Sequence, residues 1–235
     1  MAPILKKQRI ILRFDKTVFT SATGGAAKSD EVTLSIFGGD LVMIRLARLE
    51  QTAVFADACA GIIEPSSGIV NFLGRNWPEL SPDQANALRG RIGRVFKSGN
   101  WIKHLSLMDN ILLPQRHHTR RSARELCDEA GELAQRFGLP GLPLGLPGDF
   151  AAADLQRAAC VRAFMGHPLL ILLEEPTTGI FLEIISPLMD AVREARERGA
   201  AVIWLTRKHL IWKDQTLPAT QRYQLVAGKL MEVTT

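Results

Sequence analysis

The chain has 235 residues, of which 46% are hydrophobic and 23% charged, a composition typical of a globular protein with one substantial core. No segment approaches the roughly 18 consecutive apolar residues of a membrane-spanning helix, and the short, charged start at residues 1–7 does not resemble a secretory signal. We therefore expect a protein of the cytosol or of the cytosolic face of a membrane. The net charge of +5 permits contact with anionic lipid or nucleic acid but favours neither.

The three cysteines lie far apart in the sequence and have no metal-ligand spacing. Cys59, Cys127 and Cys160 are also odd in number. This pattern predicts reduced, mostly buried thiols and no metal site.

The first part of the chain follows an alternation of strands and helices. Residues 10–14 and 32–36 alternate as strands and flank a Gly/Ala/Ser-rich turn at 21–29, which predicts an antiparallel pair. A short apolar strand at 41–44 precedes a helical stretch that ends near Gly61, and a further strand follows at 68–73. The rhythm indicates an α/β fold.

The middle of the chain predicts a helical lobe. Ser122 and Glu125 form a capping-box pattern ahead of apolar residues at helical spacing, so we expect a helix over 122–137, closed by Gly138. The Gly/Pro/Leu-rich segment 138–148 cannot hold regular structure and predicts a linker inside this lobe.

The last part of the chain predicts a parallel sheet. A helix is expected from about Asp154 to Phe164, and another over 187–198. Residues 169–173 and 201–205 are continuous apolar runs of strand length, as found in strands buried on both faces.

Six short segments each contain a recognisable sequence motif. They are residues 39–44, 60–68, 91–96, 107–111, 155–164 and 170–179. In order and spacing they resemble the ABC ATPase family over nearly the whole chain, from about residue 10 to 233. The resemblance implies a P-loop-NTPase-like α/β core with an antiparallel β subdomain and an inserted α-helical lobe. One domain, 1–235, would consist of a core at 1–97 and 166–235 and a lobe at 98–165.

The phosphate-loop position departs from the family. The family places G-x-x-x-x-G-K-[ST] here, and a phosphate cradle needs glycines for its backbone turn, a lysine for the phosphates and a hydroxyl for Mg²⁺. In this chain Leu46 and Gln51 replace the glycines, Thr52 the lysine and Ala53 the hydroxyl residue. A substitute role for Arg45 or Arg48 is an alternative, but a cation cannot restore a nest closed by Cβ atoms. We expect a helix to start here, with Leu46 or Leu49 packed inward.

The signature position is altered in the same manner. The family's L-S-G-G-Q aligns with Phe150 followed by Ala151, Ala152, Ala153 and Asp154. Asp154 is expected to cap the following helix and to repel the phosphate that this helix end receives in the family.

The remaining catalytic positions also differ, with one exception. Lys97 stands at the Q-loop glutamine, Phe181 at the D-loop aspartate and Arg207 at the switch histidine. His209 lies two residues past the switch position and is interpreted as a surface or loop residue. The exception is the Walker B pair Glu174 and Glu175, whose carboxylates are retained, with Glu175 at the place of the family's catalytic glutamate. Without the cradle we interpret both as structural.

The resemblance also implies partners. In the family, the edge beside the Q-loop receives a helix of the membrane-spanning subunit, and the matching region here carries Trp101, Ile102, His104 and Met108. These residues are candidates for the permease contact, with packing inside the lobe as the alternative. In sequence, segments 110–114 and 142–160 resemble the bacterial lipid-trafficking branch of the ABC importers, which works with mammalian-cell-entry proteins.

These patterns are compatible with three functions. The first is a non-hydrolysing transporter subunit that binds no cofactor, docks on a permease and pairs with a second ABC subunit, with no nucleic-acid partner. The second is a residual ATPase using Glu175 with ATP and Mg²⁺. The third is a soluble regulator or nucleic-acid-associated protein that uses the basic run of Arg116, His117, His118, Arg120 and Arg121.

Overall fold

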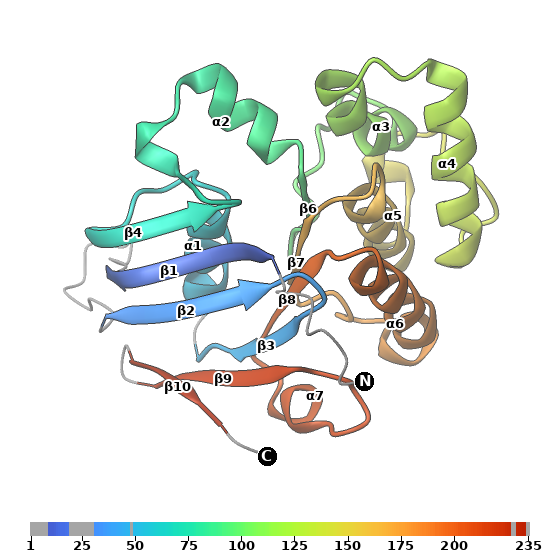
Figure 1. Cartoon of the computed structure of the whole chain (residues 1–235). Helices are drawn as coiled ribbons and strands as arrows, with labels where there is room; N and C mark the ends of the chain where they lie inside the picture. The colour runs from blue at the N-terminus through green and yellow to red at the C-terminus, as the bar shows by residue number, and fades with distance from the viewer. Residues whose placement is uncertain (1–8, 19–30, 48, 227–228, 234–235) are drawn as a thin grey trace, which may run out of the picture.

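A computed structural model describes residues 9–18, 31–47, 49–226 and 229–233, and within them strands and helices alternate along the chain around two sheets. Figure 1 shows the strands β1, β2 and β4 on one side and the helices α3 to α6 on the other. The predicted turn at 21–29 lies outside the described residues. The described part of the chain matches the predicted fold class, a mixed α/β core with an antiparallel sheet and a helical lobe.

The smaller sheet is antiparallel in the order β2-β1-β4-β5. Its strands are β1 (Ile10–Val18), β2 (Val32–Phe37), β4 (Ser67–Phe72) and β5 (Arg75–Asn76). The predicted pair of strands is therefore confirmed, and β4 joins it from beyond the first helix. Its apolar side chains pack toward α1 (Leu49–Cys59), where the Phe14 and Phe55 rings lie 5.2 Å apart.

The larger sheet has the order β10-β9-β3-β8-β7-β6. Its strands are β3 (Leu41–Arg45), β6 (Ile92–Val95), β7 (Leu170–Glu174), β8 (Ala201–Thr206), β9 (Gln221–Val226) and β10 (Lys229–Glu232). All pairings are parallel except that of β10 with β9. Every residue of β7 and β8 is buried, as the continuous apolar runs predicted, because layers of side chains cover both faces of the sheet.

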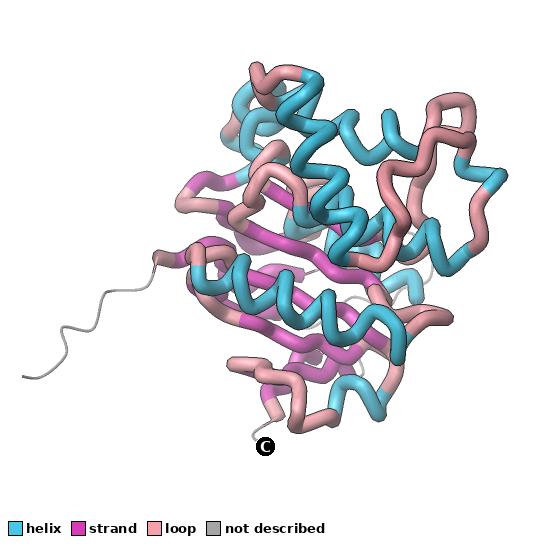
Figure 2. The backbone as a smooth tube through the Cα atoms, turned by 90° about the vertical axis from the view of Figure 1, so that its right-hand side faces the viewer, coloured by secondary structure: helices cyan, strands magenta, loops and turns pink. Residues whose placement is uncertain are grey.

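The helices cover the strands and form the lobe. Figure 2 shows helices lying across the strands on the side turned toward the viewer. Beyond α1, the helices are α2 (Pro82–Arg89), α3 (Leu107–His118), α4 (Ala123–Arg136), α5 (Ala152–Phe164), α6 (Phe181–Glu197) and α7 (His209–Lys213), with short 3-10 turns at Trp77–Glu79 and Pro147–Asp149. Within the described ranges every helix is too short or too polar to traverse a lipid bilayer.

One predicted helix start was wrong. Helix α6 begins at Phe181, ahead of the predicted start at Pro187, which lies inside it. The apolar residues Ile184 and Leu188 are both fully buried at helical spacing, so their packing holds the helix through a proline that removes one backbone hydrogen bond. Helix α5 begins at Ala152, close to the predicted start at about Asp154, and ends at Phe164 as predicted.

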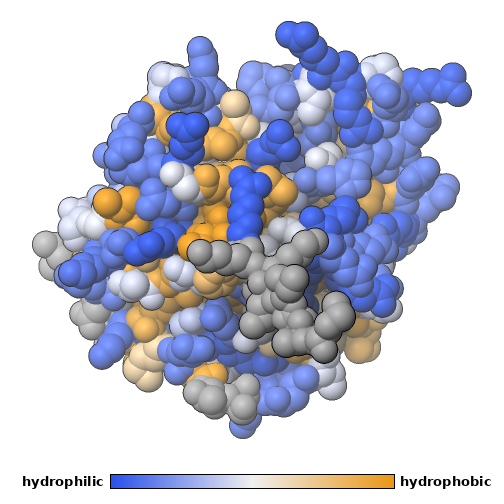
Figure 3. Space-filling model, viewed as in Figure 1, coloured by the Kyte–Doolittle hydropathy of each residue, from blue (hydrophilic) through white to orange (hydrophobic). Residues whose placement is uncertain are grey.

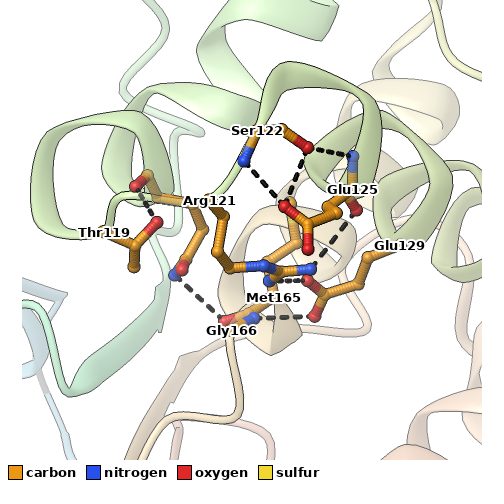
Figure 4. A network of polar contacts seen from close by, with 8 residues as sticks. Thr119, Arg121, Ser122, Glu125, Glu129, Met165 and Gly166 are labelled. Carbon is orange, nitrogen blue, oxygen red and sulfur yellow. Dashed lines mark hydrogen bonds and ion pairs between the residues drawn. The ribbon is translucent and has the colours of Figure 1, made fainter.

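The lobe is tied to the end of α5 by a polar network at the start of α4. Ser122 and Glu125 form the predicted capping box. One turn further, the Glu129 carboxylate accepts a hydrogen bond from the Gly166 backbone N–H at 2.8 Å and pairs with the Arg121 guanidinium (Figure 4). One acidic side chain therefore joins the α4 helix to the turn that follows α5.

We expect Glu129→Ala to lower the free energy of unfolding by about 2 kcal/mol, because it removes charge-assisted hydrogen bonds from a partly buried site. Urea denaturation measures the change. Glu132→Ala is the matched control, since Glu132 is an exposed residue of the same helix, and it should stay within about 0.5 kcal/mol of the wild type. Equal losses in the two variants would mean that helix propensity, and not the network, sets the effect.

Candidate functional site

The predicted site positions gather at one edge of the larger sheet. Because β3, β8, β7 and β6 run parallel, their carboxyl ends lie at the same edge. The segments that follow these strands begin at Leu46, Arg207, Glu175 and Phe96 respectively. The phosphate-loop, switch, Walker B and Q-loop positions are thus neighbours in space, although they are up to about 160 residues apart in sequence.

At the phosphate-loop position the chain enters helix α1 with its apolar and hydroxyl side chains turned inward. Leu46 is 1% exposed, and its backbone N–H donates to the Thr206 carbonyl at 3.1 Å. Thr52 is also buried, and its hydroxyl has no hydrogen-bond partner in the described part of the chain. The prediction of a helix here with Leu46 packed inward is confirmed. The Arg48 residue and the side chain of Leu49 lie outside what the structure describes.

Glu174, at the end of β7, is held in a buried ion network. Its Oε1 accepts from Nε of Arg94 at 2.5 Å, and Nη1 of the same guanidinium donates to Oδ1 of Asp57 on α1 at 2.6 Å. The side chains of Arg94 and Glu174 are 8% and 4% exposed. Burial raises the pKa of Glu174, and the charge of Arg94 opposes that rise. Arg94 thus compensates a carboxylate that would otherwise be buried alone.

Glu175 is held by the strand that carries the switch position. It adopts a positive φ of 47°, unusual for a residue with a Cβ. Its carboxylate accepts the Arg207 backbone N–H at 2.6 Å and the Thr206 hydroxyl at 3.0 Å, while Nε of Arg207 lies 3.5 Å away. The two carboxylate oxygens therefore bind the last residue of β8 and the residue that follows it.

The start of α5 differs from the prediction. Asp154 does not cap this helix: the N-cap residue is Ala151, which offers no side-chain hydrogen bond. The Asp154 carboxylate lies inside the first turn and accepts from Nη1 of Arg157 at 2.8 Å, because the guanidinium one turn further competes for it. Ala151 and Ala152 are exposed, and Ala153 is partly buried against the core.

The segment after β6 is anchored through stacked cations and rings. The guanidinium carbon of Arg94 lies 4.3 Å from the Phe96 ring centroid, and that of Arg162 lies 5.4 Å from the same ring and 4.2 Å from the Trp101 ring. Arg162 also donates to the Gly99 carbonyl. Burial lowers the pKa of Arg162 to about 10, so this guanidinium remains charged near neutral pH.

The partner-binding candidates divide into two groups. Trp101 and Met108 are partly buried and pack against the core, whereas Ile102 is 36% exposed and His104 is exposed. The loop backbone is held by the buried Asn110, whose Oδ1 accepts the Ile102 N–H at 2.7 Å. Lys97, at the Q-loop position, is partly exposed at the turn where this segment begins.

Sequence reasoning missed the structural roles of Arg94, Asn110 and Arg162. A signal existed for Arg94, since a charged residue inside a short apolar strand is buried only when it has a partner. The partners themselves, Asp57 and Glu174, come from distant parts of the chain, so the sequence pattern could not identify them.

The other predicted positions lie at helix starts or in internal ion pairs. His209 begins the short helix α7 and is exposed, and Phe181 begins α6. In the basic run, Arg116 pairs with Asp109, and Arg121 pairs with an acidic side chain of α4. Among the described residues no group of three or more His, Cys, Asp or Glu is arranged to hold a metal ion.

Comparison with known proteins identifies a family and several relatives. The family model described as "ABC transporter" matches residues 53–178. The octopine permease ATP-binding protein P of Rhizobium meliloti is 28% identical over 162 residues, which cover 64% of this chain and 62% of that protein. The macrolide export ATP-binding/permease protein MacB of Chromobacterium violaceum is 30% identical over 194 residues, 80% of this chain and 29% of that protein. The chain thus spans less than two thirds of the length of either relative.

Solved structures share the fold. The dimeric bacterial ABC transporter cassette MJ0796 superposes with a TM-score of 0.83 at 21% identity, covering 95% of this chain and 98% of that one. The same cassette in a post-hydrolysis state with ADP and Pi gives a TM-score of 0.82. At this identity the likeness establishes the architecture and not the chemistry.

We expect Ala151→Ser to stabilise the protein by about 1 kcal/mol, because a serine hydroxyl at the N-cap accepts a backbone N–H of the first turn of α5. The melting temperature should rise by about 2–4 °C. Ala152→Ser, one residue inside the helix, is the matched control and should give no increase. A rise in the control alone would show that Ala151 is not the N-cap.

Proposed function

Because the chain belongs to the ABC transporter family, we propose that it is a non-hydrolysing ABC subunit of a membrane transporter, which docks on a permease and couples to it. The observation that supports this most is the internal pairing of both Walker B carboxylates, Glu174 with Arg94 and Glu175 with the turn at Arg207. Under this proposal the fold is used for binding and the chemistry of the family is not.

The residues at the sheet edge fit ATP and Mg²⁺ poorly, which supports the proposal that neither is a cofactor of this chain. A phosphate chain needs inward-pointing backbone N–H groups and a lysine, and its Mg²⁺ needs a hydroxyl and a free carboxylate. Here Leu46 and Gln51 stand at the glycine positions, and the hydroxyl of Thr52 is buried. Glu174 already binds a cation within the chain.

The proposed partners are a permease and a second ABC subunit. We place the permease contact on the first turn of α3 and the segments bound to it. Ile102 is 36% exposed beside Lys103 and His104, and Leu144 and Leu146 are 71% and 47% exposed. The 143–145 loop is hydrogen bonded to α3, because its carbonyls accept the N–H groups of residues 107 and 108 at 2.8 Å. These side chains thus flank one helix end.

The exposed apolar side chains of Ile102, Leu144 and Leu146 suit contact with an apolar helix end of the permease. Figure 3 shows the same face as Figure 1: its hydrophobic side chains (orange) gather near the centre, whereas α3 lies toward the upper right, so this central area is separate from the proposed contact. We propose that the lobe at 98–165 carries the permease contact and the core at 1–97 and 166–235 carries the contact with a second ABC subunit. The chain would then lie on the cytoplasmic face of the inner membrane. Nucleic acid is not a proposed partner, since two cations of the basic run are paired internally.

For the transported substrate we propose only a chemical class, that of the lipid-trafficking branch of ABC importers. Segments 110–114 and 142–160 support lipid or phospholipid transport by their similarity in style to the lipid-trafficking importers. The named relatives serve octopine permease and macrolide export, so the family spans chemically different cargo.

The alternative function, a residual ATPase that uses Glu175, requires the chain to bind ATP tightly, whereas the proposed function does not. We expect the purified chain to bind ATP·Mg²⁺ more weakly than about 1 mM, because the glycines, the lysine and the hydroxyl are absent together. Titration calorimetry measures this, with an ABC cassette of intact motifs as the positive control. Saturable binding in the micromolar range, with hydrolysis lost in Glu175→Gln, would favour the ATPase.

We expect Ile102→Asp to release the chain from its permease, because a charge placed on the docking surface must be desolvated when the two proteins meet. Co-purification from membranes should fall by about tenfold or more, while the melting curve of the isolated chain stays unchanged. Ile69→Asp is the matched control: Ile69 is 43% exposed on β4, away from the proposed surface, and its variant should co-purify normally. If Ile102→Asp co-purifies as the wild type does, the permease docks elsewhere.

A further inference from the structure

Arg94 is a buried cation with two separate sets of partners. On one side it binds the carboxylates of Glu174 and Asp57, from β7 and α1. On the other its guanidinium lies over Phe96. Since residue 94 pairs with Leu172 in the parallel register and side chains two residues apart share a face, Arg94 and Glu174 project from the same face of the sheet.

The contact with Phe96 continues into the segment proposed to dock the permease. Phe96 has the two guanidinium groups of Arg94 and Arg162 over its ring, and Arg162 in turn lies 4.2 Å from Trp101. The backbone is constrained at the same place, because Gly99 has a φ of 74° and an added Cβ would lie 2.1 Å from the Trp101 ring. A series of contacts from Glu174 through Arg94, Phe96 and Arg162 therefore reaches Trp101, within residues 97–106.

We propose that Arg94 is an internal cation that replaces a bound metal at Glu174 and, through Phe96 and Arg162, holds the docking segment 97–106 in one arrangement without nucleotide. The inference rests on the proposed function, because a chain without ATP needs another source of charge at Glu174. It goes further by identifying a positioning residue and the route by which it acts.

Two physical arguments favour this role over simple charge neutralisation. Neutralisation of Glu174 requires a nearby cation but not one whose guanidinium also lies over Phe96, so neutralisation alone does not account for the ring contact. A cation between a carboxylate and an aromatic face is held in both position and orientation, because the guanidinium is planar and donates in fixed directions. A guanidinium held in a fixed orientation can position the Phe96 ring, and with it the segment 97–106 that follows.

The test uses Arg94→Ala in the full chain, without nucleotide or partner, and measures melting temperature and amide hydrogen exchange of residues 97–106. We expect the melting temperature to fall by roughly 10 °C, since a buried carboxylate loses its partner. Exchange in 97–106 should accelerate by about tenfold through the lost stacking. Low-millimolar guanidinium chloride should reverse part of both effects, whereas sodium chloride at the same concentration should not.

The matched control is Arg89→Ala. Arg89 also combines a ring contact, 5.5 Å to the Trp77 centroid, with hydrogen bonds to the carbonyls of Ala60 and Gly61. Its loss should lower the melting temperature and leave exchange in 97–106 at the wild-type rate. Wild-type exchange in a folded Arg94→Ala, or no reversal by guanidinium, would overturn the proposal.

A second variant covers the case in which Arg94→Ala does not fold. Arg94→Met combined with Glu174→Gln removes both charges, and replacement of a buried pair by neutral groups usually preserves folding. Exchange in 97–106 should still be faster than in the wild type, because methionine carries no charge to stack on Phe96; an unchanged rate overturns the proposal. ATP titration of the wild type decides the proposed function independently, since none of these measurements contains nucleotide.

Discussion

The parallel pairing of β3, β8, β7 and β6 is the constraint on which the rest of the site depends. Parallel strands must all end at the same edge, so residues from four distant segments meet there whatever their side chains are. In a nucleotide-binding protein this edge is where ligands bind. Here the same geometry places Glu174 and Glu175 beside protein groups that satisfy them, Arg94 and the turn at Arg207.

Burial then determines what those carboxylates can do. A carboxylate that is 4% exposed cannot remain ionised without a compensating charge, and Arg94 supplies it from the adjacent strand. The same guanidinium stacks on Phe96, so the electrostatic need of the core and the position of the following segment are met by one side chain. Under the proposed function, one side chain would both replace a ligand at Glu174 and hold the segment that docks the permease.

The lobe shows how a surface is built on such an anchor. Asn110 is buried and binds the loop backbone at Ile102, which leaves the Ile102 side chain partly in solvent. Trp101 instead packs inward beneath Arg162. Both residues were candidates for the permease contact in the sequence, and only their packing separates the buried one from the exposed one.

Sequence alone determined the main strands and helices, because the signals for these elements are local, and the family resemblance implied the fold class. The continuous apolar runs at 169–173 and 201–205, the capping box at Ser122 and the spacing of the sequence motifs each depend on nearby residues. The inward packing of Leu46 was predictable for the same reason, since a loop without glycine favours a helix start.

Tertiary structure decided the rest. Pro187 stays inside α6 because the core packs around this helix, and Asp154 pairs with Arg157 instead of capping α5. The pairing of Arg94 with Glu174 and Asp57 joins residues 80 and 37 positions apart. Such contacts arise from the order of strands in the sheet, a property that no local pattern encodes.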